Sequence, residues 1–422
     1  YKFSFSFNPM KIEPDTVKGF QDFLPPESLK RQAIVRTIEK YFRLYGFLPI
    51  ETPLIEFDEL MKPENISQEQ EDEAVSDRFR LKDRGNRNLG LRYEFTFQLA
   101  RIFKMNPNIK LPFRRYQIGQ VFRDEPISST RFRQFTQCDA DIIGSSDINS
   151  EAELLSMLSD ILKDLGISAE IQINSRKLIS SLIDSVEIPN TNAVIKELDK
   201  TGKISEDEIK VNLKKYTSSN QIITLFKLLE KDLDFYKENG FEGAEEVLNL
   251  ISACKKYGIK VKFNQNLMRG LSYYTGNIFE VFSPEIKGSI AGGGRYDKVV
   301  GKFTNREIPA VGISFGLERL SQIAKPQISQ IPKALLISIE EDNETIKLAK
   351  KLRAEKISCI TAFGNTGKQL EYANSQAIPY VIFIGEDEVS SKKFKLKNMQ
   401  SGEQKSLNEK QIIRALSKKK AK

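Results

Sequence analysis

RGLSYYTG at 269–276 and AGGGRYD at 291–297 are the two stretches that decide how this chain folds and what it holds. The first places an arginine and two adjacent tyrosines on a short segment that Thr275-Gly276 turns sharply. The second is a run of three glycines, which lets a backbone pack close to a ligand without a Cβ clash. A lone glycine run is weak evidence, because most such runs are plain turns. Together with an arginine-rich segment at 114–141, however, the two stretches indicate a pocket for a nucleotide and a small polar substrate.

The arginine-rich segment reads as a long antiparallel hairpin, with strands at 113–124 and 131–143 joined by a polar turn. Arginine presents a planar fork that pairs with phosphate and stays charged. Because alternate strand residues share a face, Arg131 and Arg133 are expected to point the same way. A solvated or salt-bridged face is the simpler interpretation of any one arginine, but the cluster favours phosphate contact, with Phe132 or Phe135 stacking on a base. Its members are Arg114, Arg115, Arg123, Arg131 and Arg133.

Polar side chains for a small substrate lie on the segment at 89–103, on the hairpin and on the tyrosine segment. Glu94, Thr96, Gln137 and Asp141 supply acceptors and a hydroxyl that could hold an ammonium group. Asp141 and Tyr274 could together hold a second polar ring. Since adjacent strand residues point to opposite faces, one of the two tyrosines at 273–274 could instead belong to the core.

Composition narrows the chemistry that the chain can perform. The 422 residues are 40% hydrophobic and 29% charged, which is typical of a globular protein with two or three domains. The net charge of +8 is compatible with a polyanionic partner or with a lysine-rich surface. No apolar run is long enough to span a membrane. The sequence contains no histidine, which excludes Ser-His-Asp and Cys-His catalysis and any imidazole metal ligand.

The three cysteines are far apart, which argues against a disulfide framework, a secreted protein or a zinc site, and favours the cytoplasm.

The pattern of apolar and polar residues along the chain divides it into parts. Residues 1–9, before Met10, are expected to be an extension or an artefact of start assignment, and the core is expected to be interrupted by a helical insertion. The expected parts are 10–170 (core, first part), 171–262 (insertion), 263–325 (core, second part) and 332–422 (a compact α/β module).

These motifs resemble class II aminoacyl-tRNA synthetases, and specifically the histidyl-tRNA synthetase family, from Met10 over nearly the whole chain. Residues 19–53 are similar to the first class II motif, which forms the dimer interface in the family. Residues 122–135 resemble the second motif and residues 316–319 the third. RGLSYYTG and AGGGRYD resemble the two segments peculiar to the histidine enzymes and are far more specific.

The resemblance implies an α+β fold, with an antiparallel sheet core flanked by helices, a helical insertion and a C-terminal α/β anticodon-binding domain. It also implies a function: ATP-dependent activation of L-histidine to histidyl-adenylate, followed by transfer to the 3′ end of tRNA(His). ATP would be a substrate, Mg²⁺ would neutralise the leaving pyrophosphate, and no histidine or cysteine would ligate a metal. A cytoplasmic homodimer without membrane association is the expected form.

The resemblance assigns roles to individual residues. Arg123 would hold the α-phosphate and the substrate carboxylate, Arg319 the far end of the triphosphate, and Arg269 the α-phosphate as charge builds; these three are the expected catalytic residues. The expected histidine-binding residues are Glu94, Thr96, Arg123, Gln137, Asp141, Arg269, Tyr273 and Tyr274. The expected ATP-binding residues are Arg123, Glu125, Arg133, Phe135 and Arg319.

The chain departs from the family pattern at two positions. Ser272 stands where the family usually has an aspartate, which removes a charge close to Arg269. Asp141 stands where some members carry glutamate, a longer acid of the same charge.

Other functions remain open from the sequence. One is a non-catalytic paralogue that regulates histidine biosynthesis, although such paralogues usually lose the tyrosine segment and the C-terminal module. Another is a module that senses uncharged tRNA, which would be expected to lose phosphate-holding arginines. A synthetase for threonine, proline or glycine is disfavoured by RGLSYYTG.

Overall fold

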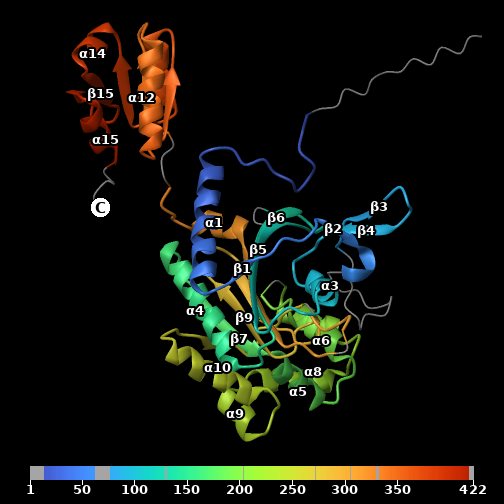
Figure 1. Ribbon diagram of the computed structural model, residues 1–422. Coiled ribbons are helices and arrows are strands. Elements are labelled where there is room, and N and C mark those ends of the chain that lie inside the picture. The colour runs from blue at the N-terminus through green and yellow to red at the C-terminus, as the bar shows by residue number, and fades with distance from the viewer. Residues whose placement is uncertain are drawn as a thin grey trace, which may run out of the picture. The chain divides into compact units, whose positions relative to one another are not determined.

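The computed structural model describes residues 14–61, 77–128, 131–202, 204–270, 272–304, 306–328 and 332–417. Residues 1–9, expected to be an extension or an artefact of start assignment, lie outside the described residues. Residues 62–76 do so too; they are most of the acidic and polar segment 61–76, whose composition predicts a loop. The chain divides into two compact units, Tyr1–Pro326 and Gln327–Lys422, each with its own core (Figure 1).

An eight-stranded sheet forms the centre of the first unit, and all of its strand pairs are antiparallel except the outermost pair at each edge. The expected hairpin is confirmed, because its two strands pair directly over ten residues each. In spatial order the strands are β1 (Leu48–Pro49), β5 (Phe113–Phe122), β6 (Gln134–Ile143), β11 (Ala310–Gly316), β10 (Ser289–Arg295), β9 (Asn277–Phe282), β7 (Glu170–Ser175) and β8 (Lys262–Phe263).

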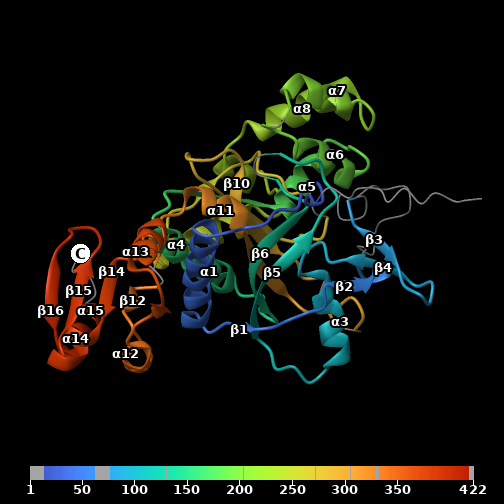
Figure 2. The same cartoon turned by 90° about the horizontal axis from the view of Figure 1, so that it is seen from above.

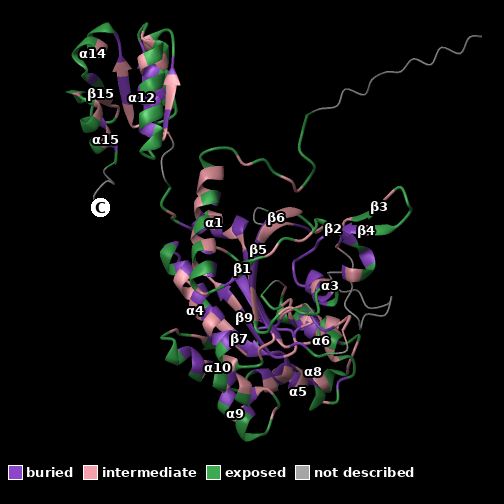
Figure 3. Cartoon of the chain, in the orientation of Figure 1, coloured by how far each residue is buried: buried purple, intermediate pink, exposed green. Residues whose placement is uncertain are grey.

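Helices cover one face of this sheet (Figures 1 and 2). They are α1 (Glu27–Leu44), α4 (Ile148–Asp164), α10 (Ala244–Lys256) and α11 (Leu317–Ile323). In α1 the buried residues Ile34, Ile38 and Phe42 recur every fourth position, so they form one apolar stripe. Phe42 packs against Tyr116 of β5 and Phe315 of β11, with ring centroids 5.3 and 6.4 Å apart. Figure 3 shows the burial that results on these helices.

The opposite face of the sheet is polar, and β6 shows why. Cys138, Ala140 and Ile142 are fully buried in the core, whereas the alternate residues Gln137, Asp139 and Asp141 line a cavity. This is the period-two alternation of a strand between an apolar layer and a site.

The segment at 171–262 is mostly helical, as expected, but its first residues differ from the expectation. Residues 170–175 form β7, which pairs with β9 inside the main sheet, and β8 at 262–263 pairs with β7. The six residues of β7 contain only two inward-facing isoleucines, Ile171 and Ile173. A segment this short does not show enough periodicity to distinguish a strand from a buried helix. The helices between them are α5 (Arg176–Asp184), α6 (Thr191–Leu198), α7 (Glu206–Leu213), α8 (Ser219–Leu229), α9 (Leu233–Glu238) and α10.

A small three-stranded sheet flanks the site. In spatial order its strands are β2 (Ile55–Phe57), β4 (Asn88–Leu91) and β3 (Arg80–Lys82). Along the chain, a short 3-10 helix, η1 (Asp58–Met61), follows β2, and α3 (Phe97–Met105) follows β4. The prolines at 49 and 53 interrupt the apolar run at 47–55, which predicts one broken strand; the structure has two short strands there instead, β1 in the main sheet and β2 in the small one.

The second unit has the expected alternation of strands and helices. Its sheet order is β13 (Cys359–Ala362), β12 (Ala334–Ser338), β14 (Tyr380–Ile384), β15 (Phe394–Asn398) and β16 (Gln404–Leu407), of which the first three are parallel. The helices are α12 (Asp342–Ala354), α13 (Thr366–Ser375), α14 (Glu386–Ser391) and α15 (Glu409–Ser417). The sequence did not predict α14, a six-residue helix with an acidic first turn.

Candidate active site

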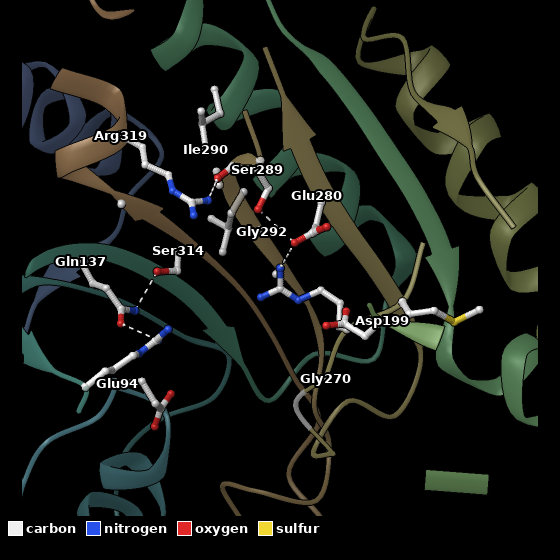
Figure 4. A pocket seen from close by; sticks show the side chains of 18 of the residues that line it. Glu94, Gln137, Asp199, Gly270, Glu280, Ser289, Ile290, Gly292, Ser314 and Arg319 are labelled. Atoms are coloured by element: carbon white, nitrogen blue, oxygen red, sulfur yellow. Dashed lines mark hydrogen bonds and ion pairs between the residues drawn. The ribbon is translucent and has the colours of Figure 1, made fainter. Parts of the chain in front are cut away.

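A cavity of about 980 Å³ lies over the polar face of the main sheet. Residues of β6, β9, β10 and β11 line it, together with the segment before α3, the chain after β5 and the end of α6 (Figure 4). Both diagnostic stretches of the sequence contribute: Arg269, Tyr273 and Tyr274 from the first, and Gly292, Gly293 and Tyr296 from the second.

Arg123 lies at the exit of β5, where aromatic rings hold its guanidinium group. Its Cζ is 4.3 Å from the Tyr93 ring centroid and 5.0 Å from that of Phe135. Its Nη2 donates to Gln137 Oε1 at 3.3 Å, and its Nη1 lies 3.7 Å from Glu125 Oε1. This arrangement presents a fixed cation to the cavity.

Glu94 and Thr96 line the cavity where the chain enters α3. The two Glu94 carboxylate oxygens accept the backbone N–H groups of Thr96 and Phe97, each at 2.7 Å. Burial raises the pKa of Glu94, and these hydrogen bonds oppose that shift. The carboxylate thus caps the N-terminus of α3, where the helix dipole stabilises a negative charge.

Asp141 is held from two sides. Its Oδ2 lies 2.6 Å from Nη2 of Arg115, which is completely buried, and its Oδ1 accepts the Tyr296 hydroxyl. Burial raises the pKa of Asp141, while Arg115 and Tyr296 lower it. Gly312 of β11 lies directly opposite, where a Cβ atom would overlap the Asp141 carboxylate.

Asp139, two residues earlier on the same face, is a cavity residue that the sequence reasoning missed. Gln137 Nε2 donates to both of its oxygens, at 3.1 and 3.3 Å, and to Ser314 Oγ at 2.8 Å. Burial raises the pKa of Asp139 to about 7, against the lowering influence of Arg115. An aspartate between two predicted binding residues at a spacing of two was the signal that could have found it.

Arg269 is paired with Glu280 of β9, which the sequence reasoning also missed. The Arg269 Nη1 atom donates to Glu280 Oε1 at 2.8 Å, and Ser289 Oγ donates to the same oxygen at 3.1 Å (Figure 4). The guanidinium lies 5.4 Å from the Tyr274 ring centroid. Glu280 therefore supplies a carboxylate beside Arg269 in a chain that has Ser272 instead of the usual aspartate.

The glycine run forms the middle of β10 and is not a turn. A Cβ on Gly292 would overlap the Arg269 guanidinium, and one on Gly293 would overlap the Gly312 carbonyl oxygen. The first glycine thus makes room for a site arginine, and the second lets β10 and β11 pack closely.

Arg319 reaches the cavity from the first turn of α11. Its Nη1 donates to the carbonyl oxygen of Ser289 (Figure 4). Burial lowers the pKa of Arg319, and Arg131 adds to that effect. Next to it, Glu318 accepts from Arg31 of α1 at 2.7 Å and from the Thr136 backbone, so it anchors this corner of the site.

The arginine cluster divides among different places. Arg123 and Arg131 line the cavity, and both lie 3.7 Å from Glu125. Arg114 instead pairs with Glu153 of α4 at 2.6 Å. The expectation that Arg131 and Arg133 share a face is wrong, because β6 begins only at Gln134 and strand alternation does not apply before it.

Arg133, expected to bind ATP, is not among the residues that line the cavity. It lies 3.1 Å from Asp124 and donates to the Glu125 carbonyl oxygen at 3.2 Å. Phe132 and Phe135, the expected stacking residues, both line the cavity. The end of α6 adds a wall that no motif indicated, consisting of Lys196, Asp199, Lys200, Thr201 and Gly202.

Among the described residues, no group of three or more cysteine, aspartate or glutamate side chains could hold a metal ion. Individual carboxylates do line the cavity, with Glu125 and Glu280 next to the arginines. That donor set fits a Mg²⁺ ion that arrives on ATP, because Mg²⁺ is usually bound by phosphates, water and one or two carboxylates.

This antiparallel sheet, with helices on one face and an arginine-lined cavity on the other, is the catalytic fold of class II aminoacyl-tRNA synthetases. The family model described as histidyl-tRNA synthetase matches residues 19–320, and that of an anticodon binding domain matches residues 333–419. The chain belongs to the histidyl-tRNA synthetase family. The fold class predicted from the sequence is thereby confirmed.

Three similar proteins illustrate the relationship. Histidine–tRNA ligase 1 of Bacillus cereus is 38% identical over 416 residues, which cover 93% of this chain and 94% of the relative. The crystal structure of histidyl-tRNA synthetase from Nostoc sp. superposes with a TM-score of 0.81 and 28% identity, covering 96% of this chain and 100% of that one. A Bacillus halodurans structure titled as an ATP phosphoribosyltransferase regulatory subunit/histidyl-tRNA synthetase shares the fold, with a TM-score of 0.70 and 22% identity, over 86% of this chain and 96% of that one.

Proposed function

We propose that this protein is a histidine–tRNA ligase, which activates L-histidine with ATP and transfers it to the 3′ end of tRNA(His). The observation that carries this function is the cavity in which RGLSYYTG, AGGGRYD and the motif arginines meet. The family supports both the activation and the transfer step. The chain also keeps the tyrosine segment and the C-terminal module, which disfavours a regulatory paralogue.

In the activation step, a carboxylate oxygen of histidine attacks the α-phosphorus of ATP. A new bond forms between that oxygen and phosphorus, the bond to the oxygen bridging to the β-phosphate breaks, and pyrophosphate leaves. The nucleophile is already ionised, so no protein base is needed. Catalysis is then positioning and electrostatic stabilisation, which suits a chain that contains no histidine.

We assign the phosphate contacts to three cavity arginines. Arg123, fixed between two aromatic rings, supports contact with the α-phosphate and the substrate carboxylate. Arg269 lies over the Gly292 backbone and supports stabilisation of the charge that builds on the α-phosphate. Arg319, from α11, is assigned to the far end of the triphosphate. Mg²⁺ bound to ATP, near Glu125 or Glu280, would offset the charge of the leaving pyrophosphate.

The amino-acid subsite is proposed to lie on the floor of the cavity. Glu94, Thr96 and Gln137 would accept the α-ammonium group, and Asp141 with Tyr274 would contact the imidazole ring. Asp141 is already fixed by Arg115 and Tyr296, so its orientation would be set before the substrate arrives. Tyr273 packs between Tyr274 and Tyr296, with ring centroids 4.7 and 5.9 Å away. Arg133 stays a prediction for ATP binding, supported by its position beside the lining segment rather than by a place in the cavity.

A homodimer in the cytoplasm is also proposed. Large apolar side chains of 17–57, a segment that contains the region similar to the first class II motif at 19–53, are exposed in the single chain; they include Val17, Leu24, Leu44, Leu48 and Leu54. Exposed apolar residues gathered in one segment are typical of a protein interface. The free, buried cysteines suit a reducing compartment. Within the described residues, no helix is long and apolar enough to cross a membrane.

Charging of tRNA(His) with labelled histidine tests this function. We expect ATP-dependent incorporation into acid-precipitable tRNA, and none into tRNA whose 3′-terminal ribose has been oxidised with periodate. Absence of charging by folded protein, with intact histidine binding, would favour the regulatory paralogue.

A further inference from the structure

Several carboxylates of the cavity are already in contact with a cation from the protein. Asp141 pairs with Arg115 at 2.6 Å, Glu280 with Arg269 at 2.8 Å, and Glu318 with Arg31 at 2.7 Å. Glu94 is stabilised differently, by two backbone N–H groups at the start of α3. These acids have their charge compensated before any ligand binds.

Asp139 differs from them. Its side chain lines the cavity and is only 6% exposed, yet it makes no ion pair within 4.0 Å in the part of the chain that the structure describes. Its hydrogen-bond partners are neutral: the Gln137 amide and the Ser314 hydroxyl. A buried carboxylate is costly unless a positive charge accompanies it, so an unpaired one in a cleft marks a place where a ligand brings that charge.

The position of Asp139 indicates which ligand group would reach it. It lies between Gln137 and Asp141 on the cavity face of β6, roughly 7 Å from each along the strand. Gln137 donates its Nε2 to Asp139, so its Oε1 is turned to the cavity side with Arg123. The amino-acid subsite proposed above therefore spans Asp139.

We propose that Asp139 is a further substrate-binding residue, whose carboxylate receives a positively charged N–H group of the amino acid. This inference rests on the proposed function and deepens it. Of the two candidate groups of histidine, we assign the α-ammonium, because it is charged throughout the neutral range whereas imidazole is largely neutral above pH 7. Asp141 is left to contact the ring.

Histidine affinity should then depend on the ionisation of Asp139. The charged and titratable groups that interact with it are Arg115 on β5, Cys138 and Asp141 on β6, and Arg92 before α3. In the free protein the pKa of Asp139 is about 7. If only the ionised form binds the ammonium, affinity falls roughly tenfold between pH 8 and pH 6 as Asp139 becomes protonated.

The test compares Asp139→Asn with wild type by calorimetric titration of three ligands. L-Histidine and histidinol carry the ammonium group, whereas 3-(imidazol-4-yl)propionate lacks it. We expect the variant to lose about 10- to 100-fold affinity for the first two and to bind the third unchanged. The pH dependence that Asp139 gives to histidine affinity in wild type should be absent from the variant. Comparing the two proteins at each pH cancels the titration of the ligand itself.

Equal weakening of all three ligands would reassign Asp139 to the ring, and unchanged affinity for all three would overturn the proposal. Glu170→Gln is the matched acid-to-amide control, since Glu170 lies at the sheet edge in an exposed pair with Lys262 and outside the cavity. The KM for ATP and the thermal unfolding of Asp139→Asn report on general damage. Failure of wild type itself to bind histidine would instead contradict the proposed function.

Discussion

Arg269 illustrates how single residues of this site depend on distant parts of the chain. Its guanidinium lies over Gly292 of β10, pairs with Glu280 of β9 and lies against the Tyr274 ring. Two strands, β9 and β10, and the segment that carries Tyr274 must therefore be folded before the arginine can contact a phosphate. Pre-arranged charges of this kind stabilise a transition state more than a ground state.

Replacing Arg269 with alanine should therefore slow adenylate formation far more than it weakens histidine binding. We expect kcat for ATP–pyrophosphate exchange to fall by about 10²- to 10³-fold, as when one oxyanion-stabilising donor is lost. Arg87→Ala serves as the control, because Arg87 lies in the exposed turn between β3 and β4 and pairs only locally with Asp83. Near wild-type exchange in Arg269→Ala would remove the residue from the mechanism.

Asp139 should also affect how the free energy of unfolding depends on pH. Its pKa in the folded protein is about 7, above the ordinary aspartate value of 3.8, so between these pH values the folded state holds a proton that the unfolded state releases. The destabilisation by this group is absent below pH 3.8 and grows as pH rises to about 7.

Asp139→Asn is consequently expected to unfold at a higher temperature than wild type at pH 8. The gain should be on the order of 1–4 kcal/mol and should shrink as pH falls from 7 towards 5. Calorimetric melting at several pH values checks this. A variant that is less stable than wild type at pH 8 would show that Asp139 is already compensated in the free protein.

At the scale of elements, β10 carries two glycines with separable tasks. Gly292 makes room for a side chain, whereas Gly293 faces the backbone of β11. We expect Gly292→Ala to fold normally but to lose most pyrophosphate exchange, since its methyl group displaces the Arg269 guanidinium. Gly293→Ala should instead reduce folded yield, because backbone cannot move aside.

Gly85→Ala, in the β3–β4 turn, is the control for both, since its added methyl would make only ordinary contact at 3.4 Å from Asp83. Circular dichroism and exchange kinetics on the same preparations separate the two effects. Full activity in Gly292→Ala would contradict the placement of Arg269.

The elements with clear periodicity were predictable from the sequence. The apolar residues at helical spacing over 27–45, among them Ile34, Ile38 and Phe42, predict α1, and the hairpin of β5 and β6 followed from its two strand-like segments and the polar turn between them. β7 was not predicted, because its pairing with β9 is made across about a hundred residues of sequence and leaves no local pattern.

Site residues that belong to a sequence motif were predictable, whereas those that only the fold brings to the cavity were not. Arg123, Arg269, Arg319 and the two tyrosines were expected, and all line the cavity. Glu280 and the wall after α6 become visible only in the folded chain, since each consists of ordinary polar residues in its own segment, whereas the spacing of Asp139 between Gln137 and Asp141 could have indicated it. Arg133 is the opposite case: its residue type and motif predicted a site residue, yet an ion pair with Asp124 accompanies a position outside the cavity lining.

At the scale of the whole molecule, the two units have separate cores and so are expected to have separable functions. A chain that ends at Pro326 should keep ATP–pyrophosphate exchange with histidine but lose most tRNA charging, because the anticodon-binding unit is gone. Comparing the two assays on the truncated and full-length proteins checks this. Equal charging by both would show that the second unit contributes little to tRNA binding.

The homodimer through 17–57 that we propose is also tested at the scale of the whole molecule. Sedimentation should give twice the mass of the chain, and Leu44→Asp should shift it to the monomer, because a buried charge opposes an apolar interface. Leu81→Asp is the control, since Leu81 is an exposed apolar residue outside that segment. A monomeric wild type would contradict the proposal.

ATP–pyrophosphate exchange with each of the twenty amino acids in turn is the most direct test of the proposed histidine activation. We expect exchange with histidine alone, since activation and amino-acid selection would occur in the same cavity. Exchange with a different amino acid, or with none from protein shown to be folded, would contradict it.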